Sequence, residues 1–202
     1  MPASILLDPA VSTTAVSYPI RRLWNVADFH RMGKTGFLHP EARLELIEGE
    51  LFEMAPIGSF HAGTVSILTR LFMQVVANSA IVHAQSPIVL NDRSEPQPDL
   101  ILLRPRPDYY LSGHPRPQDV LLLVEVSDST VHFDRKTKVP LYARHGVPEV
   151  WLVVGPKRRH IEIYRDPQPE RGSYQTRLQL REGALAPVLL PQAQIRLNEV
   201  FL

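Results

Sequence analysis

Two short runs of the chain, residues 120–124 and 150–154, are apolar at every position. Strands with no polar alternation are usually covered on both faces, as in the middle of an α/β sheet. Residues 133–145 lie between the two runs and are polar and basic with helical spacing, and Gly146 stands where a glycine commonly ends a helix. A strand, a helix and a second strand in this order indicate a βαβ unit with two parallel strands. The expected fold class is therefore α/β (α+β).

Size and composition restrict the other possibilities. The chain has 202 residues, of which 44% are hydrophobic, and its formal net charge is +1. These values suit one folded domain and exclude full disorder. We expect an N-terminal arm over residues 1–20, followed by a single domain over residues 21–202. The absence of cysteine excludes disulfides, zinc–thiolate sites and a thiol nucleophile.

The same sequence contains no apolar run of eighteen residues and no signal-peptide pattern, so we expect no membrane span and a cytoplasmic location. Near-zero net charge gives no global attraction to nucleic acid, and binding of that kind requires a local patch.

Further elements are predicted from periodicity and from capping residues. A short helix is expected over 23–33 with Asn25 as its N-cap, and a longer one over 60–78 with Ser59 as its N-cap. A hairpin is expected around Glu48-Gly49-Glu50. Additional strands are predicted at 81–83, 88–90 and 100–103, with hairpins that pair 161–164 with 174–180 and 188–190 with 195–197.

Two carboxylates occupy informative positions at the ends of predicted strands. Asp99 precedes the run 100–103, and Glu125 follows the run 120–124. If the two strands are neighbours, both side chains converge on one point, and Mg²⁺ is commonly held by one or two carboxylates together with water. The alternative is that Asp99 only starts a strand and Glu125 only ends one at the solvent.

The helix after Glu125 adds a candidate cation. Lys138 can point back toward the carboxylates, where an ammonium group orients water or offsets negative charge that develops on a phosphate. The simpler interpretation is a solvated pair with Asp134, four residues earlier. Lys136 is less favoured, because it lies about 200° around an α-helix from Lys138.

Taken together, these residues resemble the Uma-two family of the PD-(D/E)xK, restriction-endonuclease-like class. The likeness rests on Pro98-Asp99, on Glu125-Val126-Ser127, on Asp134 with Lys138 and Tyr142, and on Gly146-Val147-Pro148-Glu149-Val150-Trp151. It extends upstream to Glu45-Leu46-Ile47-Glu48-Gly49-Glu50-Leu51 and His61, and downstream to Leu190-Pro191 and Leu197-Asn198-Glu199-Val200-Phe201. It thus covers about residues 20–202.

The resemblance implies a central mixed β-sheet flanked by helices, with extra N- and C-terminal strands around a restriction-endonuclease-like core. It also implies a Mg²⁺-dependent endonuclease (Mn²⁺ being a possible substitute) that hydrolyses phosphodiester bonds of DNA. Asp99 and Glu125 match the metal ligands, while Glu45 and His61 match further residues of the catalytic site. The sequence departs from the superfamily pattern at Ser127, where a lysine is usual, and Lys138 is the expected replacement.

Two other functions stay open at this stage. One is a fold without catalysis that serves as a module binding nucleic acid or protein, which the serine at position 127 favours. An oligomeric scaffold is the other alternative. A homodimer also suits an enzyme that cuts both strands of a symmetric duplex.

Overall fold

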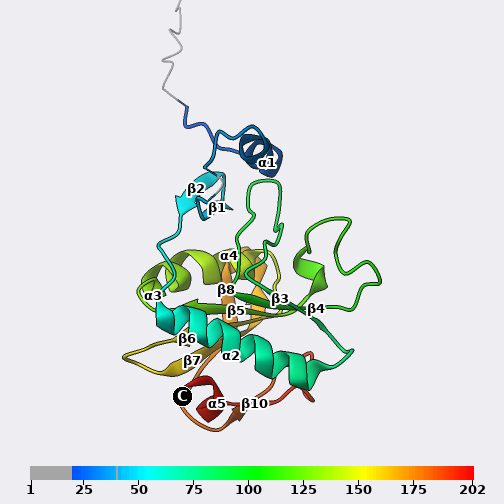
Figure 1. Ribbon diagram of the computed structural model, residues 1–202, viewed down its shortest axis with the longest axis vertical. Coiled ribbons are helices and arrows are strands. Elements are labelled where there is room, and N and C mark those ends of the chain that lie inside the picture. The colour runs from blue at the N-terminus through cyan, green and yellow to red at the C-terminus, as the bar shows by residue number, and fades with distance from the viewer. Residues whose placement is uncertain (1–19, 40) are drawn as a thin grey trace, which may run out of the picture.

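The computed structural model describes residues 20–39 and 41–202 (Figure 1). The expected arm, residues 1–20, lies outside this part of the chain except for its last residue. Within the described residues, no helix combines the length and the apolar character that crossing a bilayer requires.

A six-stranded sheet forms the centre of the molecule, in the order β3-β4-β5-β6-β7-β8. The strands are β3 (Ile81–Ala84), β4 (Leu100–Leu103), β5 (Val120–Ser127), β6 (Glu149–Val154), β7 (His160–Gln168) and β8 (Ser173–Leu180). Only β5 and β6 run parallel to each other, and the other neighbours are antiparallel. The predicted mixed sheet and its parallel pair are confirmed.

Two hydrophobic clusters cover the two faces of this sheet, and for that reason every residue of β5 and β6 is buried. On one face lie α2 (Ser59–Val76) and the short α5 (Leu197–Val200), and Phe72 of α2 packs against Trp151. On the other face lies α4 (Val139–Arg144), whose Leu141 and Tyr142 are fully buried. The predicted N-cap of α2 was wrong: Ser59 is its first helical residue and Gly58 holds the cap position.

The connection between β5 and β6 is helical but irregular. It consists of α3 (Val131–Phe133), a π-helical turn η2 (Asp134–Lys138) and α4. The N–H group of Val139 donates to the carbonyl of Asp134, five residues back. The next residue, Pro140, has no N–H group to donate and fits only near the start of a helix. The π turn therefore precedes α4, which begins at Val139 with Pro140 in its first turn, and Lys138 at the end of the π turn is buried.

The N-terminal part projects from this core as α1 (Val26–Lys34) and the hairpin of β1 (Leu44–Ile47) and β2 (Glu50–Glu53) (Figure 1). Asn25 caps α1 as predicted, since its side chain accepts from the N–H group of Asp28 at 2.7 Å. The hairpin turns at Glu48 and Gly49, both with positive φ, as a two-residue hairpin turn requires.

Two predicted strands are wrong. Residues 88–90 form a buried loop, because Pro87 precedes them and Ile88 and Leu90 donate locally to Pro96 and Ser94. Residues 188–190 lie between two prolines and make a turn. The partner of β10 (Ile195–Arg196) is instead β9 (Ala184–Leu185). The other C-terminal hairpin, β7 with β8, is confirmed and is longer than predicted. Two 3₁₀ turns, Pro117–Asp119 and Pro169–Arg171, complete the fold.

Candidate active site

Asp99 and Glu125 lie side by side on one face of the sheet. Leu100 pairs with Val124 across β4 and β5, and these two acidic residues are the next step along each strand. Both side chains are buried. One oxygen of Asp99, Oδ2, accepts a hydrogen bond of 2.8 Å from the N–H group of Val126, which fixes that carboxylate against β5. The proximity predicted from the sequence is present.

Lys138 reaches the same point from the π-helical turn. Its Nζ lies 3.0 Å from Glu45 Oε1 and 3.2 Å from Glu125 Oε1, and the side chain is 2% exposed. Lys136, in contrast, is exposed. An ammonium group from the following helix thus stands beside the carboxylates even though position 127, two residues after Glu125, is a serine.

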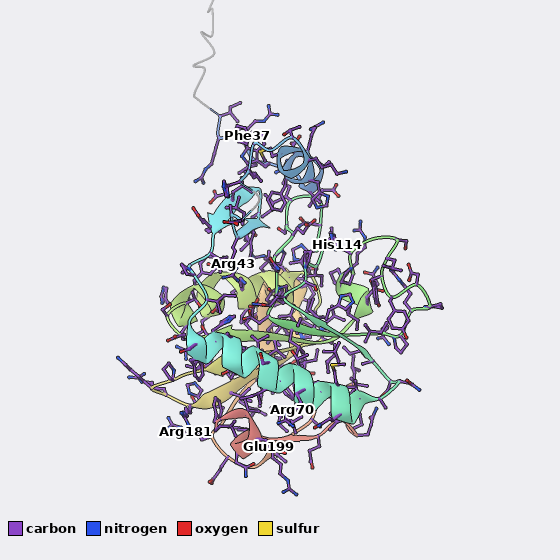
Figure 2. The ribbon with its side chains drawn as sticks, in the orientation of Figure 1. Phe37, Arg43, Arg70, His114, Arg181 and Glu199 are labelled. Carbon is purple, nitrogen blue, oxygen red and sulfur yellow. The ribbon has the colours of Figure 1, made fainter. Side chains whose placement is uncertain are left out.

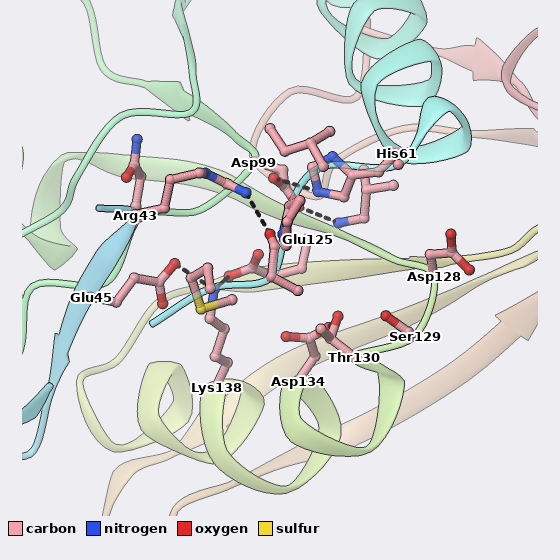
Figure 3. Close-up of a pocket in the computed structure, with 17 residues that line it drawn as sticks. Arg43, Glu45, His61, Asp99, Glu125, Asp128, Ser129, Thr130, Asp134 and Lys138 are labelled. Carbon is pink, nitrogen blue, oxygen red and sulfur yellow. Dashed lines mark hydrogen bonds and ion pairs between the residues drawn. The ribbon is translucent and has the colours of Figure 1, made fainter. Parts of the chain in front are cut away.

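Glu45 and His61 join the cluster from two other elements. Glu45 comes from β1, and its second oxygen, Oε2, is buried without a hydrogen-bond partner in the described part of the chain. His61 comes from the first turn of α2 and places Nε2 2.9 Å from Asp99 Oδ1. All five predicted site residues therefore converge, although they come from β1, α2, β5, η2 and the segment just before β4 (Figure 3).

Three further side chains support the cluster. Tyr142, which belongs to the motif that carries the family resemblance, donates from its hydroxyl to Glu125 Oε1 at 2.6 Å. The alternative interpretation, a solvated pair between Asp134 and Lys138, is wrong, because both residues are buried. Asp134 Oδ2 instead accepts from Ser127 at 2.5 Å and from Thr130 at 2.8 Å. Ser127, which replaces the usual lysine, thus positions a fourth carboxylate.

Negative charge exceeds positive charge in this cluster. Burial raises the pKa of Glu125 well above its ordinary value, and the charges of Asp99 and Asp134 add to that effect although Lys138 opposes it. Burial also raises the pKa of Glu45. For Lys138, burial works against the charge, but Glu125 and Glu45 outweigh it and raise the pKa of the ammonium. The lysine is therefore held as a cation.

A pocket of about 160 Å³ opens over these side chains. Five acidic residues line it, together with one lysine, one arginine and His61. The acidic residues are Glu45, Asp99, Glu125, Asp128 and Asp134. The arginine, Arg43, stands at the rim and donates to the carbonyl of Ala55 at 3.0 Å. Nothing in the sequence pattern singled out Arg43, because its position depends on how the β1–β2 hairpin sits above the sheet.

These residues fit a hard divalent cation. Carboxylate oxygens are the donors that Mg²⁺ and Mn²⁺ prefer, and Mg²⁺ keeps several water molecules when it binds. Glu45 Oε2 is buried and has no hydrogen-bond partner among the described residues, which leaves the cluster one oxygen with unused bonding capacity. Asp99 and Glu125 are the side chains placed to hold such an ion, with Glu45 next to them.

Comparisons with known proteins agree with this fold. Residues 26–198 match the Uma2 family model, described as "Putative restriction endonuclease". The chain is also similar to the crystal structure of "a putative nuclease belonging to DUF820" from Anabaena variabilis ATCC 29413. That likeness has a TM-score of 0.62 and 17% sequence identity, and it covers 80% of this chain and 90% of the other. None of the curated proteins matches this sequence. Because the family model spans most of its length, the chain belongs to the Uma2 family, the Uma-two family that its motifs resemble.

Proposed function

We propose that this protein is a Mg²⁺-dependent endonuclease that hydrolyses phosphodiester bonds of DNA. The observation that carries the proposal is the convergence of Asp99, Glu125 and Glu45 on the ammonium group of Lys138 in one pocket. The family description, a restriction endonuclease, supports DNA as the substrate.

The chain's own residues divide the work around that pocket. When bound, a divalent cation supplies Lewis-acid polarisation of the scissile phosphate. Asp99 and Glu125 hold the cation. Lys138 orients the attacking water or stabilises the negative charge that develops on the phosphate. Its distance of 3.2 Å from Glu125 Oε1 supports this role, because the ammonium adjoins a carboxylate assigned to the cation.

Three neighbours keep these groups in position. Tyr142 donates to Glu125 and leaves the other oxygen of that carboxylate for the cation. His61 and the N–H group of Val126 hold Asp99 from two directions. Such positioning matters because a displacement of about 1 Å in an active site can cost on the order of 100-fold in rate.

The test is cleavage of supercoiled plasmid DNA with Mg²⁺ and, separately, with Mn²⁺. We expect the wild-type chain to cut, and Asp99→Asn and Glu125→Gln each to lose at least about 100-fold in rate. Glu170→Gln, an exposed carboxylate in the Pro169–Arg171 turn, is the matched control and keeps full activity. Circular dichroism of each variant checks that the fold is retained.

Two outcomes contradict the proposal. Cleavage that survives in both carboxylate variants places the chemistry elsewhere. Binding of DNA by a wild-type chain that cuts with neither ion identifies a nucleic-acid-binding module on a nuclease fold.

We also propose that the protein acts as a homodimer, because an enzyme that cuts both strands of a symmetric duplex is favoured as a dimer. Light scattering of the DNA complex tests this proposal.

A further inference from the structure

A second group of ligand-type side chains lies in the N-terminal part of the molecule. It consists of His30 on α1, Glu95 in the loop between β3 and β4, and His114 in the loop between β4 and β5. One donor atom from each residue lies within 4.8 Å of the others. We propose that these three side chains bind a zinc-class divalent cation at a site separate from the carboxylate pocket, which none of them lines.

The geometry brings three donors together from distant parts of the chain. His30 Nε2 lies 2.8 Å and 2.9 Å from the two oxygens of Glu95. The imidazole ring of His114 stands nearly perpendicular to that of His30, at 74°, with 6.1 Å between ring centroids. Figure 2 places His114 on the loop beside the projecting N-terminal elements. A cation among the three donors requires only short side-chain shifts.

The donor set selects the kind of cation. Two imidazole nitrogens and one carboxylate oxygen are a common ligand set for Zn²⁺, with water in the fourth tetrahedral position. Mg²⁺ prefers oxygen ligands and an octahedral arrangement. The two sites of this chain therefore sort cations by chemistry, with Mg²⁺ at Asp99 and Glu125 and Zn²⁺ at the histidines.

The simpler account is an ordinary ion pair between His30 and Glu95. That account leaves Glu95 in an unusual position, because its side chain is 4% exposed and its ion-pair partner in the described chain is an imidazole. Imidazole carries a full positive charge only below its pKa, and a buried carboxylate without a permanent cation is costly. A divalent cation supplies the missing positive charge, and His114 supplies the third ligand.

The location of the three ligands on α1 and two loops indicates a structural role for the cation. Helix α1 has no buried residue, so few apolar contacts hold it. Backbone hydrogen bonds join its first residue, Val26, to Asp92 at 2.8 Å, and join Val89 to Pro115 at 3.0 Å. A cation at His30, Glu95 and His114 crosslinks the same three segments through side chains (Figure 1).

The crosslink also reaches the active site. The N–H group of Glu95 donates to the carbonyl of Leu46 at 2.7 Å, and Leu46 follows Glu45 on β1. A cation on Glu95 therefore fixes the strand that carries the Glu45 carboxylate. The proposed role is structural, and it does not depend on whether the carboxylate pocket cleaves DNA.

The test is calorimetric titration of the full chain with ZnCl₂. To remove zinc binding at the carboxylate pocket, the titration uses the double variant Asp99→Asn, Glu125→Gln, and it is repeated on the wild-type chain in saturating Mg²⁺. We expect one zinc ion per chain in both. Adding His114→Ala lowers the affinity at least about 100-fold, since even the loss of an outer-shell partner costs about 10–100-fold. His114 is exposed, so this variant keeps its fold.

The matched control is His132→Ala, another exposed histidine, which leaves zinc affinity unchanged. A second readout is the melting temperature, which zinc raises in the double variant Asp99→Asn, Glu125→Gln because the ion binds the folded state, and which it does not raise once His114→Ala is added. Equal zinc affinity with and without His114, or zinc binding that disappears only with Asp99 and Glu125, overturns the proposal.

Discussion

Two buried glutamates stand in one row across the sheet, and their surroundings are opposite. Glu125 on β5 pairs with Leu152 on β6, and Leu152 pairs with Glu162 on β7. One strand therefore separates the two carboxylates, which lie on the same face. Both side chains are nearly inaccessible, at 3% and 1%. The two glutamates thus share a row and a face of the sheet, and the set of charges around each one differs.

The negative charge of Glu162 is fully compensated by its neighbours. Arg135 donates to both of its oxygens, Arg177 lies 3.0 Å from Oε2, and Tyr164 and His160 add hydrogen bonds. Burial opposes ionisation of this carboxyl, but the hydrogen bonds from these partners outweigh it and lower its pKa to about 2. No capacity for a further cation remains at Glu162, so we assign its network to the stability of the fold.

The negative charge around Glu125 is only partly compensated. Its neighbours include the carboxylates of Glu45 and Asp99, against the single ammonium of Lys138, and its pKa is raised. Burial without sufficient positive charge costs free energy. The comparison teaches that the balance of charges around a buried carboxylate, more than the burial itself, separates a structural ion network from a site prepared for an added cation.

The largest expected effect is at Lys138, whose ammonium group pairs with both Glu45 and Glu125. Lys138→Met leaves Glu45 and Glu125 buried beside a methionine, and removing one partner of a buried ion pair costs about 3–5 kcal/mol. We expect urea denaturation to show this loss, together with loss of DNA cleavage. In the double variant with Glu45→Gln, much of the stability returns while cleavage stays absent. Equal stability of the single and double variants would show that the unpaired charge of Glu45 is not the source of the lost stability.

Glu162→Gln is the corresponding change in the compensated region. We expect a loss of about 2–3 kcal/mol in the free energy of unfolding, below the range for a fully buried pair because Arg135 and Arg177 are partly exposed. Cleavage per folded molecule stays at the wild-type level, because Glu162 lies outside the pocket. A loss of cleavage without a loss of stability would reverse the roles assigned to the two regions.

The pH dependence of stability sharpens this second prediction. Because the pKa of Glu162 is lowered from 4.5 to about 2 in the folded chain, its ionised form contributes stability that is fully present above 4.5. That contribution is lost as the pH falls through 4.5 toward 2. The difference in unfolding free energy between wild type and Glu162→Gln should therefore shrink between about pH 5 and about pH 3. A difference that stays constant over this range excludes the ion network as its source.

The positions of the active-site carboxylates could be predicted from the sequence because they depend on strand boundaries. The apolar run 100–103 matches β4, and the run 120–124 locates β5 up to the residue before Glu125, although the strand continues to Ser127. Because β4 and β5 are antiparallel neighbours, Asp99 meets Glu125. The family motifs added Glu45, His61 and Lys138. The π-helical turn that directs Lys138 inward could not be predicted, because Pro140 marks where a regular helix can begin but not the backbone hydrogen bonds before it.

The ion network around Glu162 could not be predicted from the sequence. The sequence Ile161-Glu162-Ile163 alternates as a strand with one solvent-facing side does, yet Glu162 is buried. Its partners Arg135 and Arg177 come from η2 and β8, and no local pattern states that they meet. The π turn also lets Asp134 bond to Ser127 and Thr130. Pairings between distant charged residues follow from the tertiary arrangement and leave no periodic signal.

The smallest expected effect is a gain in stability at Glu125. Glu125→Gln keeps an oxygen to accept from Tyr142 and removes one negative charge from a cluster that has too many, while Lys138 keeps Glu45 at 3.0 Å. We expect the free energy of unfolding to rise by about 1 kcal/mol without divalent cations, in the direction opposite to Glu162→Gln, although both variants replace a buried glutamate with its amide. Urea denaturation in EDTA compares the two directly. If Glu125→Gln is instead destabilised as much as Glu162→Gln, the carboxylates of the pocket are already balanced, and the excess negative charge that favours a cation there is not present.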